Sequence, residues 1–170
     1  MDRILPFPIK FDANEWFILL NIAFGFTWVF FVPKRYPRVL STLMFLYTVS
    51  VAILLDHAIA TPPLDLYDIN DQKTYELFDV ITYIMYAPYS LLFVYLFDKL
   101  NPKGLYFVAY IVVWSLISTG FEWIAWLCHV FKYNNWNLIC SFTVYIVAAT
   151  LQIKLFTYLL KYFNDSTRIQ

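Results

Sequence analysis

The side chains best suited to chemistry in this chain are a few acids and two histidines that lie near the ends of long apolar stretches. Glu122 is the clearest case, because it follows the apolar run LYFVAYIVVWSLIST before that hydrophobic stretch has ended. Carboxylate and imidazole groups are ligand types that hold zinc and related divalent cations. The candidate ligands of a divalent metal such as zinc are His57, His129, Glu122 and Asp79.

The spacing of these candidates matches no recognised metal motif. The chain has no HExxH sequence, and on one helix Glu122 and His129 would be two turns apart, about 10.5 Å in axial rise. A joint site must therefore draw on other helices, and Asp56 with His57 and Asp79 are the natural contributors. A metal held in this way could activate water, which would make the protein a membrane-embedded metal-dependent hydrolase with Glu122 or Asp79 as base or ligand.

The same acids also fit roles without a metal. An acid at the end of a membrane span can be protonated or hydrogen-bonded to Ser or Tyr of a neighbouring helix, and an ionisable group within a span often serves a ligand or a proton. The amides and indole of KYNNWN (132–137) suit a turn at the membrane surface and could line a polar pocket there. The candidate ligand-binding residues are Glu122, Asp79, Asp56, Asn135 and Trp136, and no residue is assigned a catalytic role.

The composition places these residues in a membrane protein. Of the 170 residues, 61% are hydrophobic, 22% aromatic and only 14% charged, which lies outside the range of soluble domains. The net charge is zero, so the chain lacks the basic field of a nucleic-acid-binding protein, and we expect no nucleic-acid partner. Cys128 and Cys140 form no CxxC pair, which gives no indication of a cysteine zinc site.

Five stretches are long and apolar enough to cross a bilayer, which takes about 20 residues. A helix satisfies its own backbone hydrogen bonds in lipid, so each stretch is predicted to be a helix, and the short connectors predict antiparallel neighbours. The chain is expected to form a single all-α domain over residues 1–170, a polytopic membrane helix bundle. Its five transmembrane helices are predicted at about 16–32, 39–60, 77–97, 105–127 and 138–160.

The distribution of Lys and Arg predicts the orientation of the bundle, because cytoplasmic loops are enriched in these residues. The connectors after the first and third spans and the C-terminal tail hold Lys34, Arg35, Arg38, Lys99, Lys103, Lys161 and Arg168. The opposite side holds only Arg3, Lys10, Lys73 and Lys132, together with the acids Asp65, Asp68, Asp71 and Glu76. We therefore expect the N-terminus outside and the C-terminus in the cytoplasm.

Small and polar residues recur at helical spacing along four spans, and they are expected to face the interior of the bundle because lipid rejects them. These stripes are Asn14, Asn21 and Gly25; Asp79, Tyr83, Tyr86 and Ser90; Ser115, Ser118, Glu122, Ala125 and His129; and Ser141, Tyr145, Ala148 and Gln152. Acids and both histidines fall at the outer helix ends. The stripes and these outer residues together predict an acidic mouth of the bundle that faces outward.

Two segments together resemble a known family. A glutamate, here Glu122, ahead of a Lys-Tyr-x-Asn-Trp-Asn run at 132–137, and the basic turn FVPKRYPR after the first span, resemble a family of small, uncharacterised, five-span integral membrane proteins from spore-forming Firmicutes. The resemblance implies a multi-pass protein of the bacterial cytoplasmic (inner) membrane with the same five-helix plan. The family brings no established activity or cofactor.

These features predict an integral membrane protein that binds a small ligand, an ion or a protein partner at an outward-facing polar mouth, since no catalytic motif is present. One alternative is an accessory structural subunit of a membrane complex, which the small size and odd number of spans favour. The hydrolase described above is the second alternative. Besides the lipid bilayer, a membrane protein partner or a second copy of the chain is a possible partner.

Overall fold

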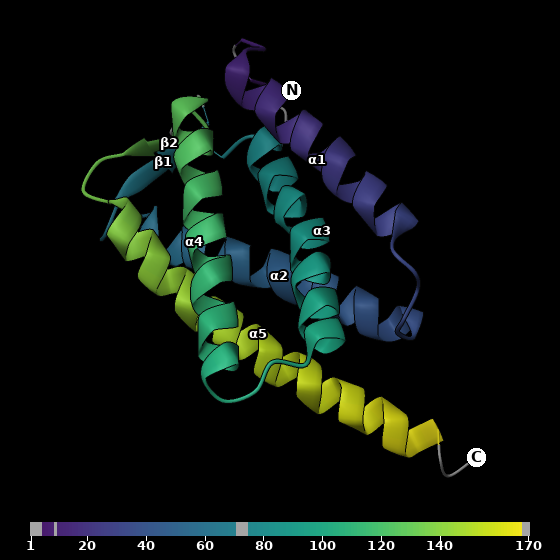
Figure 1. Cartoon of the computed structure of the whole chain (residues 1–170). Helices are drawn as coiled ribbons and strands as arrows, with labels where there is room; N and C mark the ends of the chain where they lie inside the picture. The colour runs from purple at the N-terminus through teal and green to yellow at the C-terminus, as the bar shows by residue number, and fades with distance from the viewer. Residues whose placement is uncertain (1–4, 9, 71–74, 168–170) are drawn as a thin grey trace.

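The described part of the chain folds into five long helices, with two short strands in the connectors at one end (Figure 1). The computed structural model describes residues 5–8, 10–70 and 75–167. The elements are α1 Ala13–Phe31, α2 Arg38–Ile59, β1 Tyr67–Ile69, α3 Leu77–Leu100, α4 Leu105–Leu127, β2 Phe131–Tyr133 and α5 Leu138–Thr167. Four charged residues that bear on the predicted orientation lie outside the described residues: Arg3, Asp71, Lys73 and Arg168.

Each of the five helices is long and apolar enough to cross a membrane. The bundle surface carries large apolar side chains such as Phe24, Leu116 and Leu151, each more than half exposed. Water would disfavour so extensive an apolar surface, whereas lipid tails cover it. The chain is therefore a multi-pass membrane protein, and the predicted all-α bundle of five membrane-spanning helices is confirmed.

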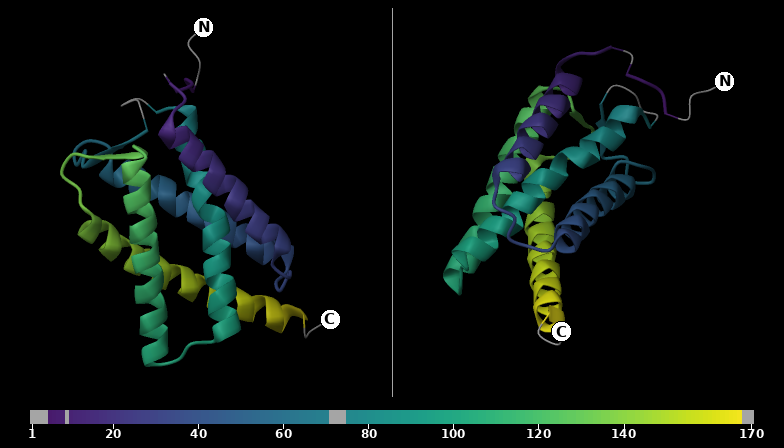
Figure 2. Two further views of the ribbon diagram at one scale, coloured as in Figure 1. Left: turned by 45° about the horizontal axis from the view of Figure 1, so that its top comes forward. Right: turned by 90° about the vertical axis from the view of Figure 1, so that its right-hand side faces the viewer.

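α3 occupies the centre of the bundle, where it packs against both α1 and α2, while α4 packs on α5 (Figures 1 and 2). α1 lies so close to α3 that a Cβ atom added at Gly25 would stand 2.6 Å from Cγ of Pro88. Glycine thus permits an approach that a side chain would block. The prediction that consecutive helices are neighbours holds for α2–α3 and α4–α5, whereas α1 packs on α3 rather than on α2.

Aromatic side chains hold α4 at a distance from α3. Tyr110 stacks on Phe93 with ring centroids 5.4 Å apart, and its hydroxyl donates to the Phe93 carbonyl at 2.6 Å. Further along the same pair of helices, Phe121 contacts Tyr89 with 5.4 Å between ring centroids. Because large rings rather than small residues make these contacts, space remains between the two helices for other side chains and for a cavity.

The two strands form an antiparallel pair that joins the α2–α3 connector to the α4–α5 connector. Tyr67 pairs with Tyr133 and Ile69 with Phe131. The ladder extends beyond the strands, since the N–H of Asn70 donates to the Val130 carbonyl at 2.9 Å. The sequence predicted a turn at 132–137 and no strand in either connector, so this small sheet is an addition to the predicted fold.

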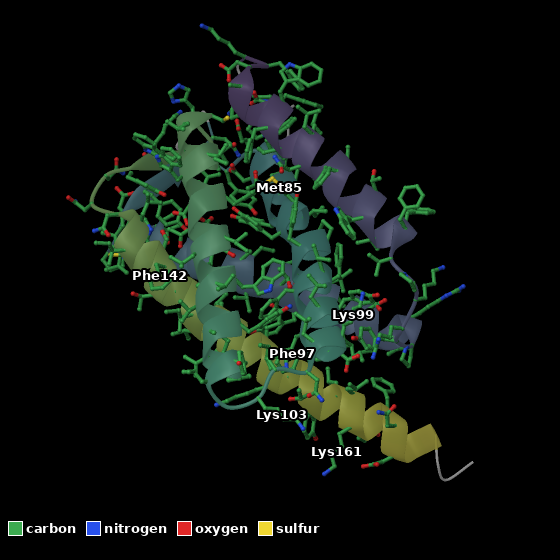
Figure 3. All side chains as sticks on the ribbon, viewed as in Figure 1. Met85, Phe97, Lys99, Lys103, Phe142 and Lys161 are labelled. Atoms are coloured by element: carbon green, nitrogen blue, oxygen red, sulfur yellow. The ribbon has the colours of Figure 1, made fainter. Side chains whose placement is uncertain are left out.

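The sheet marks one end of the bundle, which we call the sheet end. The opposite end, which we call the basic end, carries Lys99, Lys103 and Lys161 (Figure 3). The buried apolar residues form two clusters, one that includes Met85 toward the sheet end and one against which Phe97 packs toward the basic end. The core is therefore divided, and the site described next draws residues from both parts.

Candidate ligand-binding site

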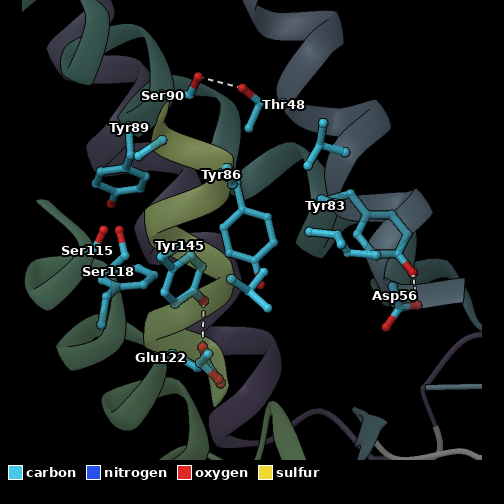
Figure 4. A pocket seen from close by; sticks show the side chains of 18 of the residues that line it. Thr48, Asp56, Tyr83, Tyr86, Tyr89, Ser90, Ser115, Ser118, Glu122 and Tyr145 are labelled. Carbon is cyan, nitrogen blue, oxygen red and sulfur yellow. Dashed lines mark hydrogen bonds between the residues drawn. The ribbon is translucent and has the colours of Figure 1, made fainter. Parts of the chain in front are cut away.

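A cavity of about 340 Å³ lies among α2, α3, α4 and α5 and beneath the β1–β2 sheet (Figure 4). Its walls contain two acids, Asp56 and Glu122, many aromatic rings and several hydroxyl groups. Among the described residues that line it, none is Lys, Arg or His. Nearly all the lining residues are buried or half-buried, and Ile117 of α4, at 53% exposure, is the exception.

Glu122 is held in the cavity wall by hydroxyl groups from two other elements. Its Oε1 accepts hydrogen bonds from Tyr133 Oη at 2.5 Å and from Ser141 Oγ at 2.6 Å, and its Oε2 accepts one from Tyr145 Oη at 2.6 Å. The side chain is 6% exposed. Every one of these donors is neutral, so Glu122 has its oxygens satisfied but has no cation beside it among the described residues.

The helical spacing explains how these groups meet. Ser115, Ser118 and Glu122 are three and four residues apart on α4 and share one face, which lines the cavity. Ser141, Tyr145, Ala148 and Gln152 do the same on α5. Because α4 and α5 pack against each other, the two faces converge, as the polar stripes predicted. Trp136 adds a second layer, since its Nε1 donates to Ser141 Oγ at 2.7 Å.

Asp56 occupies the α2 side of the same cavity. Its Oδ2 accepts a hydrogen bond from the hydroxyl of Tyr83 on α3, and Tyr67 of β1 lies beside the carboxylate. Burial raises the pKa of Tyr67, and the neighbouring carboxylate of Asp56 raises it further. Asp56 therefore has neutral phenols beside it, as Glu122 does, but its Oδ1 is buried with no hydrogen-bond partner among the described residues.

Tyr133 of β2 is likewise a neutral phenol beside a buried acid. Burial raises the pKa of this phenol, and its hydrogen bond to Glu122 raises it further. Tyr67 and Tyr133 face each other in the sheet, so one pair of cross-strand residues supplies a phenol to each acid. The sheet thus forms part of the cavity wall at its end of the bundle.

The cavity continues toward the basic end as a region of hydroxyl and amide groups. Thr48 Oγ1 donates to Ser90 Oγ at 2.5 Å, and Gln152 Nε2 also contacts Ser90 Oγ. Two other hydroxyl groups of the cavity wall, those of Ser115 and Tyr47, are buried and have no hydrogen-bond partner among the described residues. Ser115 is only 1% exposed. A buried hydroxyl without a partner is costly, so this part of the cavity holds unused hydrogen-bonding capacity.

Two of the predicted ligand-binding residues do not line the cavity. Asp79 is buried, and it accepts from the Glu76 N–H at 2.8 Å and from Asn70 Nδ2 at 2.8 Å. It caps α3 and fixes the connector from β1, which uses both of its oxygens. Asn135 is exposed and donates its backbone N–H to the Leu66 carbonyl at 3.0 Å. The remaining three candidates, Asp56, Glu122 and Trp136, all line the cavity.

The residues predicted to hold a metal are not gathered at one place in the structure. Within the described part of the chain, no group of three or more His, Cys, Asp or Glu side chains could hold one metal ion. His57 is exposed and its Nδ1 lies 2.9 Å from the Ile53 carbonyl of its own helix. His129 is exposed just past the end of α4, where its φ of 63° lies in the left-handed region. The two histidines therefore join neither Glu122 nor Asp79.

Sequence reasoning missed several residues of the cavity because they lie in connectors or in an unmarked helix. Tyr67 and Tyr133 belong to strands of only three residues, too short for an alternating pattern. Tyr47 and Thr48 lie in α2, for which no polar stripe was assigned. The available signal was the concentration of tyrosine itself, since 14 of the 170 residues are Tyr.

Comparison of the chain with protein-family models, with curated proteins and with solved structures gave no match. The site must therefore be interpreted from its own geometry.

Proposed function

We propose that the protein binds a small molecule in the cavity between α2, α3, α4 and α5. The observation that carries this proposal is the combination of a cavity of about 340 Å³ with the buried, unpartnered hydroxyl of Ser115 in its wall. Cavities of several hundred Å³ with mostly apolar walls and a few convergent polar groups are typical of ligand sites. Because no described residue hydrogen-bonds to this hydroxyl, it supports a bound molecule as its partner.

The proposal also includes the position of the cavity in the membrane. The concentration of Lys and Arg at the basic end supports an orientation with that end in the cytoplasm and the sheet end outside. The resemblance to the Firmicutes family supports the bacterial cytoplasmic membrane. In this orientation the cavity lies in the outer half of the bundle, beneath the β1–β2 sheet.

Binding rather than catalysis is the function that the geometry favours. The oxygens of Glu122 accept three hydroxyl hydrogen bonds, an arrangement that fixes the carboxylate rather than leaving it free to take a proton from a substrate. The candidate metal ligands are not gathered, so no metal-activated water is assigned.

A cavity-filling substitution tests the proposal. The purified protein is heated in detergent with small amines, neutral alcohols and carboxylates, and its unfolding is followed by tryptophan fluorescence. At least one of these classes should raise the melting temperature of the wild type. Ala148→Phe, which fills the cavity from α5, should abolish the shift, whereas Ala109→Phe, at an exposed position of α4, should retain it. A wild type that no class stabilises, or an equal shift in Ala148→Phe, would contradict the proposal.

A further inference from the structure

We infer that the ligand of this cavity is an organic cation, an amine or a quaternary ammonium ion small enough for about 340 Å³. The inference rests on the proposed function and names its ligand class. Three independent features of the wall support it: its charge, its aromatic surface and its unused hydrogen-bonding groups.

The charge of the wall is the first feature. Asp56 and Glu122 are 9% and 6% exposed, and the described lining residues include no Lys, Arg or His. Buried acids are ordinarily paired with a base or a metal ion. Here the hydrogen-bond donors Tyr83, Tyr133, Tyr145 and Ser141 are all neutral. His57 is the base beside Asp56, but it is exposed and does not line the cavity. A cationic ligand would supply the missing positive charge, while an anionic ligand would be repelled by both acids.

The aromatic surface is the second feature. The ring of Tyr86 lies between the Glu122 side and the Asp56 side of the cavity (Figure 4). Its surroundings are also aromatic, with Tyr89, Phe93, Trp114 and Tyr145 in the same wall. Ring faces attract an ammonium group, most strongly where water is excluded. A quaternary ammonium ion, which has no N–H to donate, is recognised in this way by a ring face together with a nearby carboxylate.

The unused polar groups are the third feature. Ser115 Oγ and Tyr47 Oη have no hydrogen-bond partner among the described residues, although both residues line the cavity. Neither group belongs to the hydrogen-bond networks of Glu122 and Asp56. They could therefore serve a second polar group of the ligand, such as a hydroxyl separated from the cationic centre by a short chain.

A bare metal ion fits this wall less well than an organic cation does. Calcium takes about six to eight oxygen ligands, whereas Glu122 has both oxygens occupied by hydroxyl donors. Most of the wall is ring surface and aliphatic side chain, which suits alkyl groups around a diffuse charge. Choline is accordingly the probe of choice, and 3,3-dimethyl-1-butanol is its neutral match because carbon replaces the nitrogen.

The test compares these two probes by calorimetric titration of the full chain in nanodiscs. Choline should bind wild-type protein at least about tenfold more tightly than the neutral alcohol. If neither probe nor any other class in the thermal panel binds, the proposed function fails. If the neutral alcohol binds as tightly as choline, or if carboxylates bind more tightly, the cation inference fails while the proposed function stands.

Substitutions at Tyr86 separate a ring-face interaction from a general loss of packing. Tyr86→Leu should weaken choline binding at least about fivefold more than Tyr86→Phe does, because phenylalanine keeps the ring face. The neutral alcohol should bind the two variants alike. Equal choline affinities in both variants, each confirmed as folded by its circular dichroism, would overturn the role of the ring.

Discussion

The two ends of the bundle place their charged side chains in opposite environments, buried at one end and partly exposed at the other. At the sheet end, Asp56 and Glu122 are buried in a cavity and contact neutral hydroxyls. At the basic end, a second pocket of about 390 Å³ is lined by Lys34, Arg35 and Arg38 together with apolar side chains. There Arg35 Nε pairs with Asp98 Oδ2 at 2.7 Å, and both side chains are partly exposed.

The difference shows what each environment requires. An exposed pair such as Arg35–Asp98 is screened by water and contributes at most about 1 kcal/mol. A buried carboxylate lacks that screening and depends on every hydrogen bond that reaches it. Replacing an acid of the sheet end should therefore lower the free energy of unfolding and the ligand affinity far more than breaking the ion pair of the basic end. The four substitutions below test this contrast, from the largest expected effect to the smallest.

The largest effect is expected from Glu122→Ala. The substitution leaves Tyr133, Ser141 and Tyr145 without their common acceptor, so the free energy of unfolding should fall by about 3 kcal/mol or more. Unfolding in mixed detergent and SDS micelles measures the change. Asp98→Ala is the matched control and should cost less than about 1 kcal/mol. Equal losses in the two variants would remove the contrast between the ends.

Gly25→Ala should have the next largest effect, because α3 forms walls of both pockets. The new Cβ would stand 2.6 Å from Cγ of Pro88, which lines the basic-end pocket and precedes Tyr89 of the sheet-end cavity. Overpacking of this kind costs about 2 kcal/mol in the free energy of unfolding. Gly120→Ala, whose Cβ would meet nothing within 4 Å, should be neutral or stabilising. A destabilised Gly120→Ala with an unaffected Gly25→Ala would show that the α1–α3 contact is wrong.

Tyr133→Phe should cost about 1 kcal/mol through the lost hydrogen bond to Glu122. Burial raises the pKa of Tyr133 in the folded protein, so its neutral form is stabilised by folding. The stability difference between wild type and Tyr133→Phe should be constant below pH about 10 and shrink above it. Micelle unfolding curves recorded between neutral and alkaline pH provide the test, and a difference that grows with pH would contradict the assignment.

The smallest effect is expected from Arg35→Gln. The variant removes the exposed ion pair with Asp98, so the free energy of unfolding should change by about 0.5 kcal/mol. Choline binding should be unchanged, because Arg35 does not line the sheet-end cavity. A weaker affinity for choline in this variant would show that the two ends are coupled.

The membrane fold was predictable from hydrophobicity, because each span must be apolar over its whole length. The fourth helix has the predicted limits of 105 and 127, and the first four deviate by at most three residues at either end. α5 instead continues to Thr167, seven residues beyond the predicted limit of 160. Its last part is polar, and hydrophobicity carries no information about a helix that extends beyond the lipid.

The candidate site was predictable only where one helix face defines it. The stripes on α4 and α5 were expected to face the interior of the bundle, since three- and four-residue spacings fix a helix face, and in the structure Glu122 of one meets Ser141 and Tyr145 of the other. Asp79 fits the same periodicity, yet its role is to cap α3. An acid at the third position of a helix can accept a hydrogen bond from the backbone N–H of the residue just before the helix, which here is Glu76. The phenols of β1 and β2 could not be placed, since their positions depend on pairing between distant connectors.

The most direct measurement is calorimetric titration of choline into wild-type, Asp56→Asn and Asp98→Asn protein in nanodiscs. Both substitutions replace one carboxylate by an amide of similar shape, but only Asp56 lines the cavity. The dissociation constant of choline should rise about tenfold in Asp56→Asn and stay at the wild-type value in Asp98→Asn. Unchanged binding in Asp56→Asn, or an equal loss in both variants, would contradict the claim that the sheet-end cavity binds an organic cation through its buried acids.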